Sequence, residues 1–469
     1  MIPLTFGEIA RAVNGTLRGL DPSFVTTALP VIDSRKARKG TFFLALPGER
    51  VDGNRYCQEA IDAGAEFVIT TEVFDFPSIQ VDDVGKALIS LAAYARNNSL
   101  DTIFVGLTGS QGKTTTKDLL THILSSFGET VSPAGSFNNE IGVPLTILSC
   151  TDQTKYCIVE MGARHVGDIS YLCSIAKPSI GLVLVVGSAH VGEFGSQLAI
   201  AQAKAELIDS LPDSGVAILG TYDQFTPHMA DGREIRSITF GESSTSIVRA
   251  ADIEAREGCA HFDLVTPDGR APVSLRLLGL HQISNALGAA AVATALGIKI
   301  ESIAASLSTA ESNSKWRMEL HDAGGILVIN DSYNANPESM SAALRTLALL
   351  AQERGGISWA FLGKMHELGE SEAEDHLRIG RLASDLGIDQ LVAVGSNLYL
   401  DGLQLDFAAG DEMTTHYFLT QEEALGLSRH FSPGDVVLLK ASRAEHLDEL
   451  AEKILINIGN QVESEGGVQ

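Results

Sequence analysis

The chain has 469 residues, 45% of them hydrophobic, which is too long for one core of ordinary size and predicts two to four domains. The formal net charge of −25 argues against a surface built to bind nucleic acid or an anionic membrane. It still permits anionic small ligands, because a few local donors can hold a phosphate. The five cysteines are odd in number and no pair has Cys-x-x-Cys spacing, so neither disulfides nor a zinc ribbon is expected.

The amino-terminal segment gives no sign of export. Its sequence, MIPLTFGEIARAVNG, contains Glu8 and lacks the basic start and the long apolar run of a signal peptide. No stretch of the chain approaches about 18 consecutive apolar residues, the length that a membrane span needs. Together with the cysteine pattern, these features predict a protein of the reducing cytoplasm.

The first part of the chain, residues 1–98, alternates short helical and strand-like patterns. Strands are expected at 40–46 and 65–70, where apolar residues follow one another closely. A helix over 85–98 ends in a polar pair, which is typical of a boundary. We therefore expect a first domain over residues 1–98.

A second unit, expected over residues 99–312, begins with the near-continuous apolar run 101–107, which suits a buried parallel strand. Similar runs follow at 156–161, 180–186 and 215–220. Helical patterns lie between most of these runs, and this alternation predicts an open, mostly parallel sheet. Residues 235–278 alternate as antiparallel strands do, and an alanine-rich helix is expected over 281–297.

A third unit is expected over residues 313–462. Its predicted strands lie at 325–331, 358–363, 390–395, 416–419 and 435–441. Helical segments separate them, so this unit is a second βα domain. The remaining tail, 463–469, is expected to be disordered.

The segment TGSQGKTTT, which follows the first strand of the second unit, has the composition of a phosphate-binding loop. Its glycines let the backbone approach phosphate oxygens, and the amides at the helix start can bind anions. Lys113 would place a charge on the terminal phosphates, and the Thr114 hydroxyl would bind Mg²⁺. The general pattern has a glycine five residues before Gly112, where this chain has Leu107; its glycine is Gly109. The strand–loop–helix setting favours a phosphate loop over a chance Gly-Lys-Thr turn.

Two polar side chains follow apolar strands of the same sheet, at the edge where open α/β sheets bind ligands. Glu160 ends the run 156–161, and His190 lies on a glycine-rich loop after 180–186. Glu160 is a candidate ligand of a metal ion at the phosphates, and His190 is a candidate contact to the metal or to a phosphate. The alternatives are a solvated strand end for Glu160 and an ordinary surface position for His190.

Lys204 lies on the apolar stripe of its predicted helix, four residues after Ile200. A lysine in that position either extends its ammonium group to solvent or occupies a pocket with a chemical purpose. Burial would lower its pKa and leave a neutral, nucleophilic amine. Spacing alone leaves both interpretations open.

With these motifs in place, the chain resembles the Mur ligase family, the ATP-dependent amide-bond ligases of peptidoglycan synthesis. TGSQGKTTT is similar to the family's phosphate loop, which accounts for the departure from the general pattern. The strings NNEIGVPLTIL (138–148), DSYNANPESM (331–340) and MHELGE (365–370) resemble the branch that adds D-alanyl-D-alanine to UDP-N-acetylmuramoyl tripeptide. The string DSRKARKGTFFLALPGERVDGNRY is similar to the family's uridine-nucleotide domain.

The resemblance implies an α/β protein with the three-domain Mur ligase architecture. A UDP-substrate domain would precede a central P-loop ATPase domain with a parallel sheet, and a C-terminal Rossmann-like domain would bind the incoming dipeptide. ATP and Mg²⁺ would be the cofactors. UDP-N-acetylmuramoyl tripeptide and D-alanyl-D-alanine would be the partners, with neither nucleic acid nor membrane insertion, and we expect a monomer.

The resemblance also implies roles for individual residues. ATP binding falls to Thr108, Gly109, Ser110, Gln111, Gly112, Lys113, Thr114, Thr115, His281, Asn285, Arg317, Asp331, Asn334 and Asn336. The substrate would be bound by Ser34 and Arg35 at the uridine end and by Asn138, Asn139 and Glu140. The metal would be bound by Thr114, Glu160, His190 and Lys204, the last as a carbamate. Lys113, Glu160, His190 and Lys204 would form the catalytic set.

Three positions carry residues other than the family's usual ones. Asn54 and Gln282 stand where His and Asn are usual, and both positions concern binding contacts. Lys364 stands where Asp is common, on the side of the dipeptide.

The implied reaction activates the tripeptide's terminal carboxylate as an acyl phosphate, which the amine of D-alanyl-D-alanine attacks. A segment near 310–316 is the candidate hinge for closing the C-terminal domain. The alternatives are a ligase for another acceptor (addition of the third residue, or folylpolyglutamate synthesis), a P-loop NTPase switch or motor, and a nucleotide-sensing module. The sequence does not separate lysine from diaminopimelate as the tripeptide's third residue.

Overall fold

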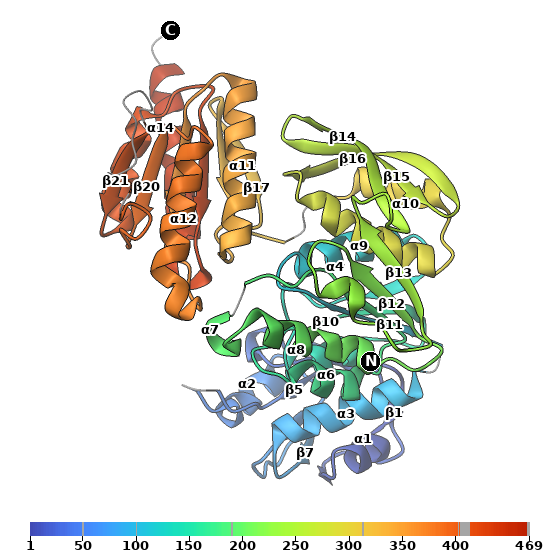
Figure 1. The fold of residues 1–469 in the computed structure, drawn as a ribbon. Coiled ribbons are helices and arrows are strands. Elements are labelled where there is room, and N and C mark those ends of the chain that lie inside the picture. Colours follow the sequence, from blue (N-terminus) through green and yellow to red (C-terminus); the bar gives the residue numbers. More distant parts are fainter. Residues whose placement is uncertain are drawn as a thin grey trace.

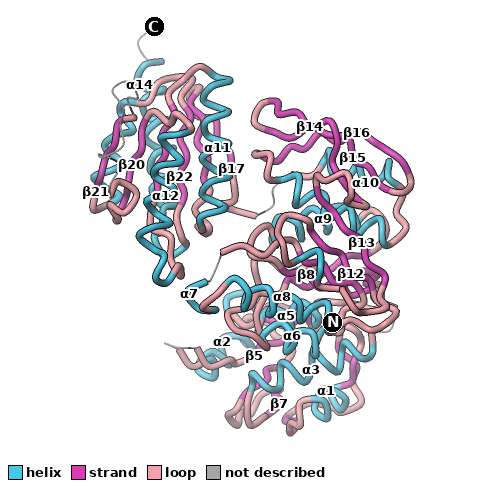
Figure 2. Tube along the Cα trace, in the orientation of Figure 1, coloured by secondary structure: helices cyan, strands magenta, loops and turns pink. Residues whose placement is uncertain are grey.

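The computed structural model describes residues 1–48, 51–99, 101–188, 191–311, 314–401, 403 and 413–466, with side chains to residue 461. The chain forms three successive α/β units, each built on its own main sheet (Figures 1 and 2). Within the described residues, no helix is both long enough and apolar enough to cross a lipid bilayer.

The N-terminal unit contains a five-stranded sheet in the order β2-β7-β6-β5-β4. Its strands are β2 (Thr16–Arg18), β4 (Leu29–Val31), β5 (Thr41–Leu44), β6 (Val68–Thr70) and β7 (Ser78–Gln80). β4 to β7 are parallel, and β2 is antiparallel to β7. A separate pair consists of β1 (Leu4–Thr5) and β3 (Val25–Thr26), and the helices are α1 (Phe6–Ala12), α2 (Cys57–Asp62) and α3 (Val84–Asn98).

The central unit contains a nine-stranded sheet in the order β16-β15-β14-β13-β12-β11-β8-β10-β9. Its parallel part comprises β8 (Ile103–Thr108), β9 (Glu129–Val131), β10 (Thr154–Glu160), β11 (Ile180–Val183), β12 (Val216–Gly220) and β13 (Arg236–Gly241). The remaining strands are β14 (Val248–Arg256), β15 (Cys259–Thr266) and β16 (Gly269–Leu278), and β15 is antiparallel to both of its neighbours. The antiparallel patch expected at 235–278 is therefore present, except that its first strand joins the parallel sheet.

Helices cover both faces of this central sheet. They are α4 (Lys113–Ser125), α5 (Gly142–Leu148), α6 (Asp168–Ala176), α7 (Val191–Phe194), α8 (Gln197–Asp209), α9 (Gln282–Ala295) and α10 (Ile300–Thr309). Side chains of β8 alternate between the faces: Phe104 packs in the core with α5, α6 and α8, and Val105 packs with α4 and α9. Burial on both faces is the reason that this strand is apolar along its length.

The C-terminal unit contains a six-stranded sheet in the order β17-β18-β22-β19-β20-β21. Its strands are β17 (Glu319–Ala323), β18 (Ile326–Asn330), β19 (Ser358–Leu362), β20 (Gln390–Val394), β21 (Thr414–Phe418) and β22 (Val436–Lys440). Only β17 is antiparallel to its neighbour among these described strands. α11 (Pro337–Arg354) and α12 (Glu372–Asp385) pack on one face, and α13 (Gln421–Leu425) and α14 (Leu447–Gly466) on the other.

Short 3₁₀ turns complete the described elements. They are η1 (Ser34–Lys36), η2 (Gly53–Tyr56), η3 (Thr226–His228), η4 (Gly369–Ser371), η6 (Gly426–His430) and η7 (Arg443–Glu445).

The first two units share one hydrophobic core. Leu88 and Leu91 of α3 belong to the same buried cluster as Val143 and Ile147 of α5. The C-terminal unit stands beside the central one and approaches it near α7 (Figure 1). Residues 312 and 313 of the expected hinge lie outside the described residues, but Ser314 donates a hydrogen bond to Asp118 of α4.

The chain end differs from the expectation. Disorder was predicted from residue 463, whereas the final helix extends to Gly466, and 467–469 lie outside the described residues. The tail is polar and contains glycines. Because it has no periodic apolar residues, its sequence gave no sign that the preceding helix would continue into it.

Candidate active site

The loop between β8 and α4 has a backbone that requires glycine. Gly112 precedes α4 with φ of 80°, and a Cβ there would lie 2.2 Å from Oδ1 of Asn285. At Gly109 a Cβ would lie 2.9 Å from Cβ of Leu184. Because α9 and the residue after β11 press against the loop, side chains are excluded at these two positions, as they are in a phosphate-binding loop.

Two lysines lie in the interior next to this loop. Lys113 donates a hydrogen bond from Nζ to the carbonyl oxygen of Gly109 over 2.7 Å. Burial lowers the pKa of Lys113, and the carboxylate of Glu160 acts in the opposite direction. Burial, with a smaller contribution from the charge of Lys113, lowers the pKa of Lys204 to about 7. Two like charges close together in a poorly solvated site favour an anionic ligand or a neutral amine on one of them.

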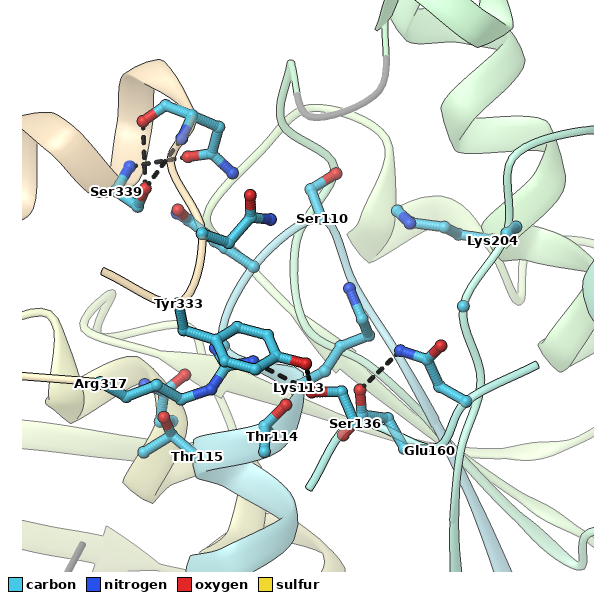
Figure 3. A pocket seen from close by; sticks show the side chains of 18 of the residues that line it. Ser110, Lys113, Thr114, Thr115, Ser136, Glu160, Lys204, Arg317, Tyr333 and Ser339 are labelled. Carbon is cyan, nitrogen blue, oxygen red and sulfur yellow. Dashed lines mark hydrogen bonds between the residues drawn. The ribbon is translucent and has the colours of Figure 1, made fainter. Parts of the chain in front are cut away.

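Lys204 occupies a pocket and does not extend to solvent. The residue is 5% exposed and follows Ala203 on the buried side of α8. Its side chain lines the same cavity as Lys113 (Figure 3). Of the two interpretations that the sequence left open for Lys204, the structure has the pocket position.

Glu160 ends β10 and pairs with Leu107, the next-to-last residue of β8. The residue is 1% exposed, and Oε1 accepts a hydrogen bond from Nδ2 of Asn138 over 2.9 Å (Figure 3). Its Oε2 is buried and has no hydrogen-bond partner among the described residues. A buried, unsatisfied carboxylate oxygen is costly, and it fits an oxygen ligand of Mg²⁺.

A complete metal site is not formed by the described side chains alone. Within them, no group of three or more His, Cys, Asp or Glu residues is arranged to hold a metal ion. His190, one of the expected ligands, lies outside the described residues. Thr114 and Lys204 line the cavity with Glu160. A carbamate on Lys204 would add the second anionic oxygen group.

His281 precedes α9 and is held without charge. Burial lowers its pKa to about 4, and Nδ1 has no hydrogen-bond partner among the described residues. Gln282 lies between it and the loop: its Nε2 is 3.1 Å from Nε2 of His281, and its Oε1 accepts from Asn285 over 2.7 Å. Gln282 thus orients both neighbours. A neutral imidazole with one free ring nitrogen suits a polar ligand edge such as a nucleobase.

Three side chains join the central and C-terminal units. The guanidinium of Arg317 lies 4.1 Å from the centre of the Tyr333 ring, in cation–π contact. The hydroxyl of Ser136 donates to that of Tyr333 over 2.7 Å and accepts from Arg317 over 3.3 Å (Figure 3). Arg317 was predicted from the sequence, whereas Ser136 and Tyr333 were not, because only the docking of two domains brings them together.

The C-terminal wall also contains a buried ion pair. Lys440 ends β22 and donates from Nζ to Oδ2 of Asp331 over 2.6 Å and to the carbonyl of Asn334 over 2.9 Å. The other oxygen of Asp331 accepts from the backbone of Met318 over 3.1 Å. Asn336 caps α11 by accepting from the backbone of Ser339 over 2.8 Å. Lys440 was missed, although a lone charge at the end of an apolar strand was a usable signal.

These elements enclose a cavity of about 530 Å³. All the predicted nucleotide-binding residues line it except Thr108, which ends β8, and Gly109, the first residue of the loop. The predicted substrate residues Asn138, Asn139 and Glu140 line it as well. One cavity therefore combines a phosphate-type loop, two interior lysines and a carboxylate with side chains from the opposite domain.

Comparison with known proteins places this arrangement in a family. Family models match residues 31–98 ("Mur ligase family, catalytic domain"), 107–293 ("Mur ligase middle domain") and 316–443 ("Mur ligase, glutamate ligase domain"). A UDP-N-acetylmuramoyl-tripeptide--D-alanyl-D-alanine ligase of Mycobacterium tuberculosis is 39% identical, over 97% of this chain and 98% of that protein. The chain belongs to the Mur ligase family. The ligase of the same name from Escherichia coli K12 is 32% identical over 97% and 99%.

Solved structures of Mur ligases agree with this fold. MurF from Acinetobacter baumannii superposes with a TM-score of 0.85 at 33% identity, over 97% of this chain and 99% of that one. MurF from Thermotoga maritima, crystallised with ADP, has a TM-score of 0.77 at 27% identity, over 93% and 99%. The predicted α/β fold of the Mur ligases, with its parallel sheets, is confirmed.

The expected uridine residues of this Mur ligase lie elsewhere. Ser34 and Arg35 belong to η1 of the N-terminal unit and do not line the cavity. The side chain of Arg35 is 82% exposed and pairs with Asp33 over 2.9 Å, while Ser34 donates to Glu59 over 3.1 Å. A uridine site on η1 would bind the far end of a long substrate whose other end reaches the cavity.

The unusual residues of this Mur ligase have local partners. Asn54 accepts from Thr70 over 2.7 Å and donates to Asp52 over 2.9 Å. Lys364 pairs with Glu372 over 2.9 Å. Both substitutions are thus accommodated within their own domains.

Replacing Gly112 by alanine should abolish tight nucleotide binding. The left-handed backbone alone costs a non-glycine residue roughly 1–2 kcal/mol, and the new Cβ would collide with Asn285. We expect ADP affinity, measured by titration calorimetry, to fall at least about tenfold. Gly426→Ala is the control, since its Cβ would have no neighbour within 4 Å. Equal ADP affinity in Gly112→Ala and the parent would contradict the loop assignment.

Proposed function

We propose that this chain is an ATP-dependent ligase that joins D-alanyl-D-alanine to the terminal carboxylate of UDP-N-acetylmuramoyl tripeptide. The products are the UDP-linked pentapeptide, ADP and phosphate, in peptidoglycan precursor synthesis. The observation that carries the proposal is identity of 39% over 97% of the chain to ligases of this specificity. The cavity supports it, because phosphate-binding and acceptor-side residues face one another across it.

The proposed domains follow the three sheets. Residues 1–98 bind the UDP part of the substrate, 99–312 bind ATP, and 313–462 bind the incoming dipeptide. The three family models, over 31–98, 107–293 and 316–443, lie within these limits. In addition, the main sheet of each proposed domain is formed entirely from its own strands.

The phosphate loop holds ATP with its terminal phosphate toward the substrate carboxylate. A structural relative at 27% identity binds ADP, which supports this nucleotide. The carboxylate attacks the γ-phosphorus, and Lys113 stabilises the negative charge on the phosphoryl oxygens during transfer. An acyl phosphate and ADP result. Arg317, which reaches the cavity from the C-terminal side, is placed to hold the same group.

Side chains of the central domain would hold Mg²⁺. Thr114, Glu160 and His190 are the proposed Mg²⁺ ligands with carbamylated Lys204. Bound Mg²⁺ supplies charge neutralisation at the phosphates. The free Oε2 of Glu160 supports this role. The lowered pKa of Lys204 favours the neutral amine, which adds to CO₂ with loss of one proton to give the carbamate.

The amine of the dipeptide then attacks the acyl carbon. A tetrahedral intermediate expels phosphate and leaves the amide. Because acyl phosphates react with water, the site has to exclude it, and the contact of Arg317 and Tyr333 with Ser136 narrows the cavity from the C-terminal side. The chain is proposed to act as a monomer. The five free cysteines support the reducing cytoplasm as its location.

The acceptor is tested directly with purified protein. D-alanyl-D-alanine, meso-diaminopimelate, lysine and glutamate are each offered with ATP, Mg²⁺ and the muramoyl tripeptide, or its dipeptide precursor for the single amino acids. We expect phosphate release and a joined product only with D-alanyl-D-alanine, and no release without the UDP substrate. Joined product with another acceptor alone would identify a related ligase, and ATP turnover independent of the muramoyl peptide would identify an NTPase.

Lys204→Ala should lose most ligase activity and regain part of it with added short carboxylic acids, which replace the carbamate oxygens. The loss expected for a ligand of the reacting site is at least about 100-fold in kcat. Rates are measured with and without formate or acetate. Lys299→Ala, at an exposed lysine, is the matched control. Activity that survives both the substitution and the removal of bicarbonate would refute the carbamate.

Arg35→Ala should raise KM for the UDP substrate about tenfold or more while leaving KM for ATP within about twofold, since Arg35 lies outside the ATP cavity. Steady-state kinetics with each substrate varied in turn measure the two constants. Arg11→Ala, at an exposed arginine of α1, is the control. Equal effects on both KM values would contradict a separate uridine site.

A further inference from the structure

One carboxylate of the C-terminal domain contacts the central domain beside the phosphate loop. Glu338 lies in the first turn of α11, just after the cap residue Asn336. Its Oε1 accepts a hydrogen bond from the backbone amide of Ser188 over 2.9 Å, and its Oε2 accepts from the hydroxyl of Ser188 over 3.0 Å. Both oxygens are thus used on a single residue of the other domain.

The segment that Glu338 holds also contacts the phosphate loop. The amide of Gly187 donates to the hydroxyl of Ser110 over 2.8 Å, and the amide of Ser110 donates to the carbonyl of Val185 over 2.9 Å. A Cβ on Gly187 would lie 3.2 Å from Oε1 of Glu338 and 3.4 Å from Cβ of Ser110. Residues 185–188 are therefore packed between the phosphate loop and α11.

The C-terminal domain touches the same region a second time, at α7. The amide of Gly192 donates to the carbonyl of Glu367 over 3.3 Å. Gly192 and Gly369 meet backbone to backbone, because a Cβ on Gly192 would lie 2.7 Å from the Gly369 nitrogen. Contacts at Ser188 and Gly192 show that this part of the central domain is a docking surface for the C-terminal domain.

We infer that Glu338 is a positioning residue for the ligase reaction: it fixes the C-terminal domain against segment 185–188 and, through Ser188 and Gly187, against Ser110 of the phosphate loop. This inference rests on the proposed function. Its physical basis is that the acceptor and the phosphoryl group come from different domains, so their relative orientation depends on the contacts between those domains. Small errors in such alignment reduce rates strongly.

A purely local role for Glu338 would have a different signature. A carboxylate in the first turn of a helix is stabilised by the helix dipole whatever it touches. Asp retains that charge but is one methylene shorter, so it loses the reach to Ser188. Gln loses the charge but keeps the length, an acceptor for the Ser188 amide and a second polar atom for its hydroxyl. The two variants therefore separate position from charge.

The experiment compares Glu338→Gln, Glu338→Asp and Glu338→Ala with Glu374→Ala, which removes an exposed carboxylate from the first turn of α12. Ligation is measured with ATP, the muramoyl tripeptide and D-alanyl-D-alanine. We expect kcat to fall about tenfold for Asp and Ala, and less than about threefold for Gln and the control. KM for the UDP substrate should stay within about twofold in all four, because η1 is on another domain.

A second measurement does not depend on turnover. Amide hydrogen exchange of residues 185–188 should quicken in Glu338→Ala and Glu338→Asp but not in Glu338→Gln, with the melting temperature unchanged. Adding Ser188→Ala to Glu338→Ala should cause no further loss, since the partner is already gone. The inference would be overturned by an unchanged kcat in Glu338→Asp together with a lowered kcat in Glu338→Gln. Equal kcat and equal exchange rates in Glu338→Ala and Glu374→Ala would also overturn it. A parent enzyme that forms no joined product would instead overturn the proposed function.

Discussion

The close contact between the phosphate loop and its surroundings governs the rest of the site. Asn285 of α9 and Leu184 after β11 press on the loop so tightly that Gly112 and Gly109 have no space for a Cβ. The contact holds the loop against α9 and against the residue that follows β11. It also orients α9, and with it the neutral His281 and the linking Gln282. A rigid loop keeps its amides directed at one point in space, as anion binding requires.

Around that point the protein gathers charges that are unfavourable in its interior without a ligand. Lys204 is buried and Lys113 is half-buried, both have lowered pKa values, and one oxygen of Glu160 lacks a described partner. In the proposed function, each cost would be relieved differently: by ATP phosphates at Lys113, by carbamylation at Lys204 and by Mg²⁺ at Glu160. The site is thus electrostatically complementary to the complex, at some expense to the stability of the free protein.

The sequence predicted those parts that depend on local pattern. The apolar strand β8 and the glycines after it identified the loop, and the stripe on α8 identified Lys204 as a buried candidate. Contacts between domains could not be predicted in this way. Ser136 and Tyr333, for example, lie almost 200 residues apart, and neither belongs to a periodic apolar pattern. Strands as short as β2 and β9 have three residues each and too few side chains to form a pattern. Arg317 and Asp331 were predicted to bind ATP from the family resemblance, because their spacing in the sequence alone did not single them out.

The two domain junctions differ in chemistry, and this difference determines how the chain can be divided. Helices α3 and α5 meet through leucine, valine and isoleucine in one continuous core. Separating the first unit from the second would therefore expose a large apolar surface. The second and third units meet through hydrogen bonds and backbone approaches, which water can replace, and through a smaller apolar contact in which Leu278 of β16 joins the third unit's hydrophobic cluster. A fragment ending at residue 311 would therefore be a sensible expression target, whereas one ending at residue 98 would invite aggregation.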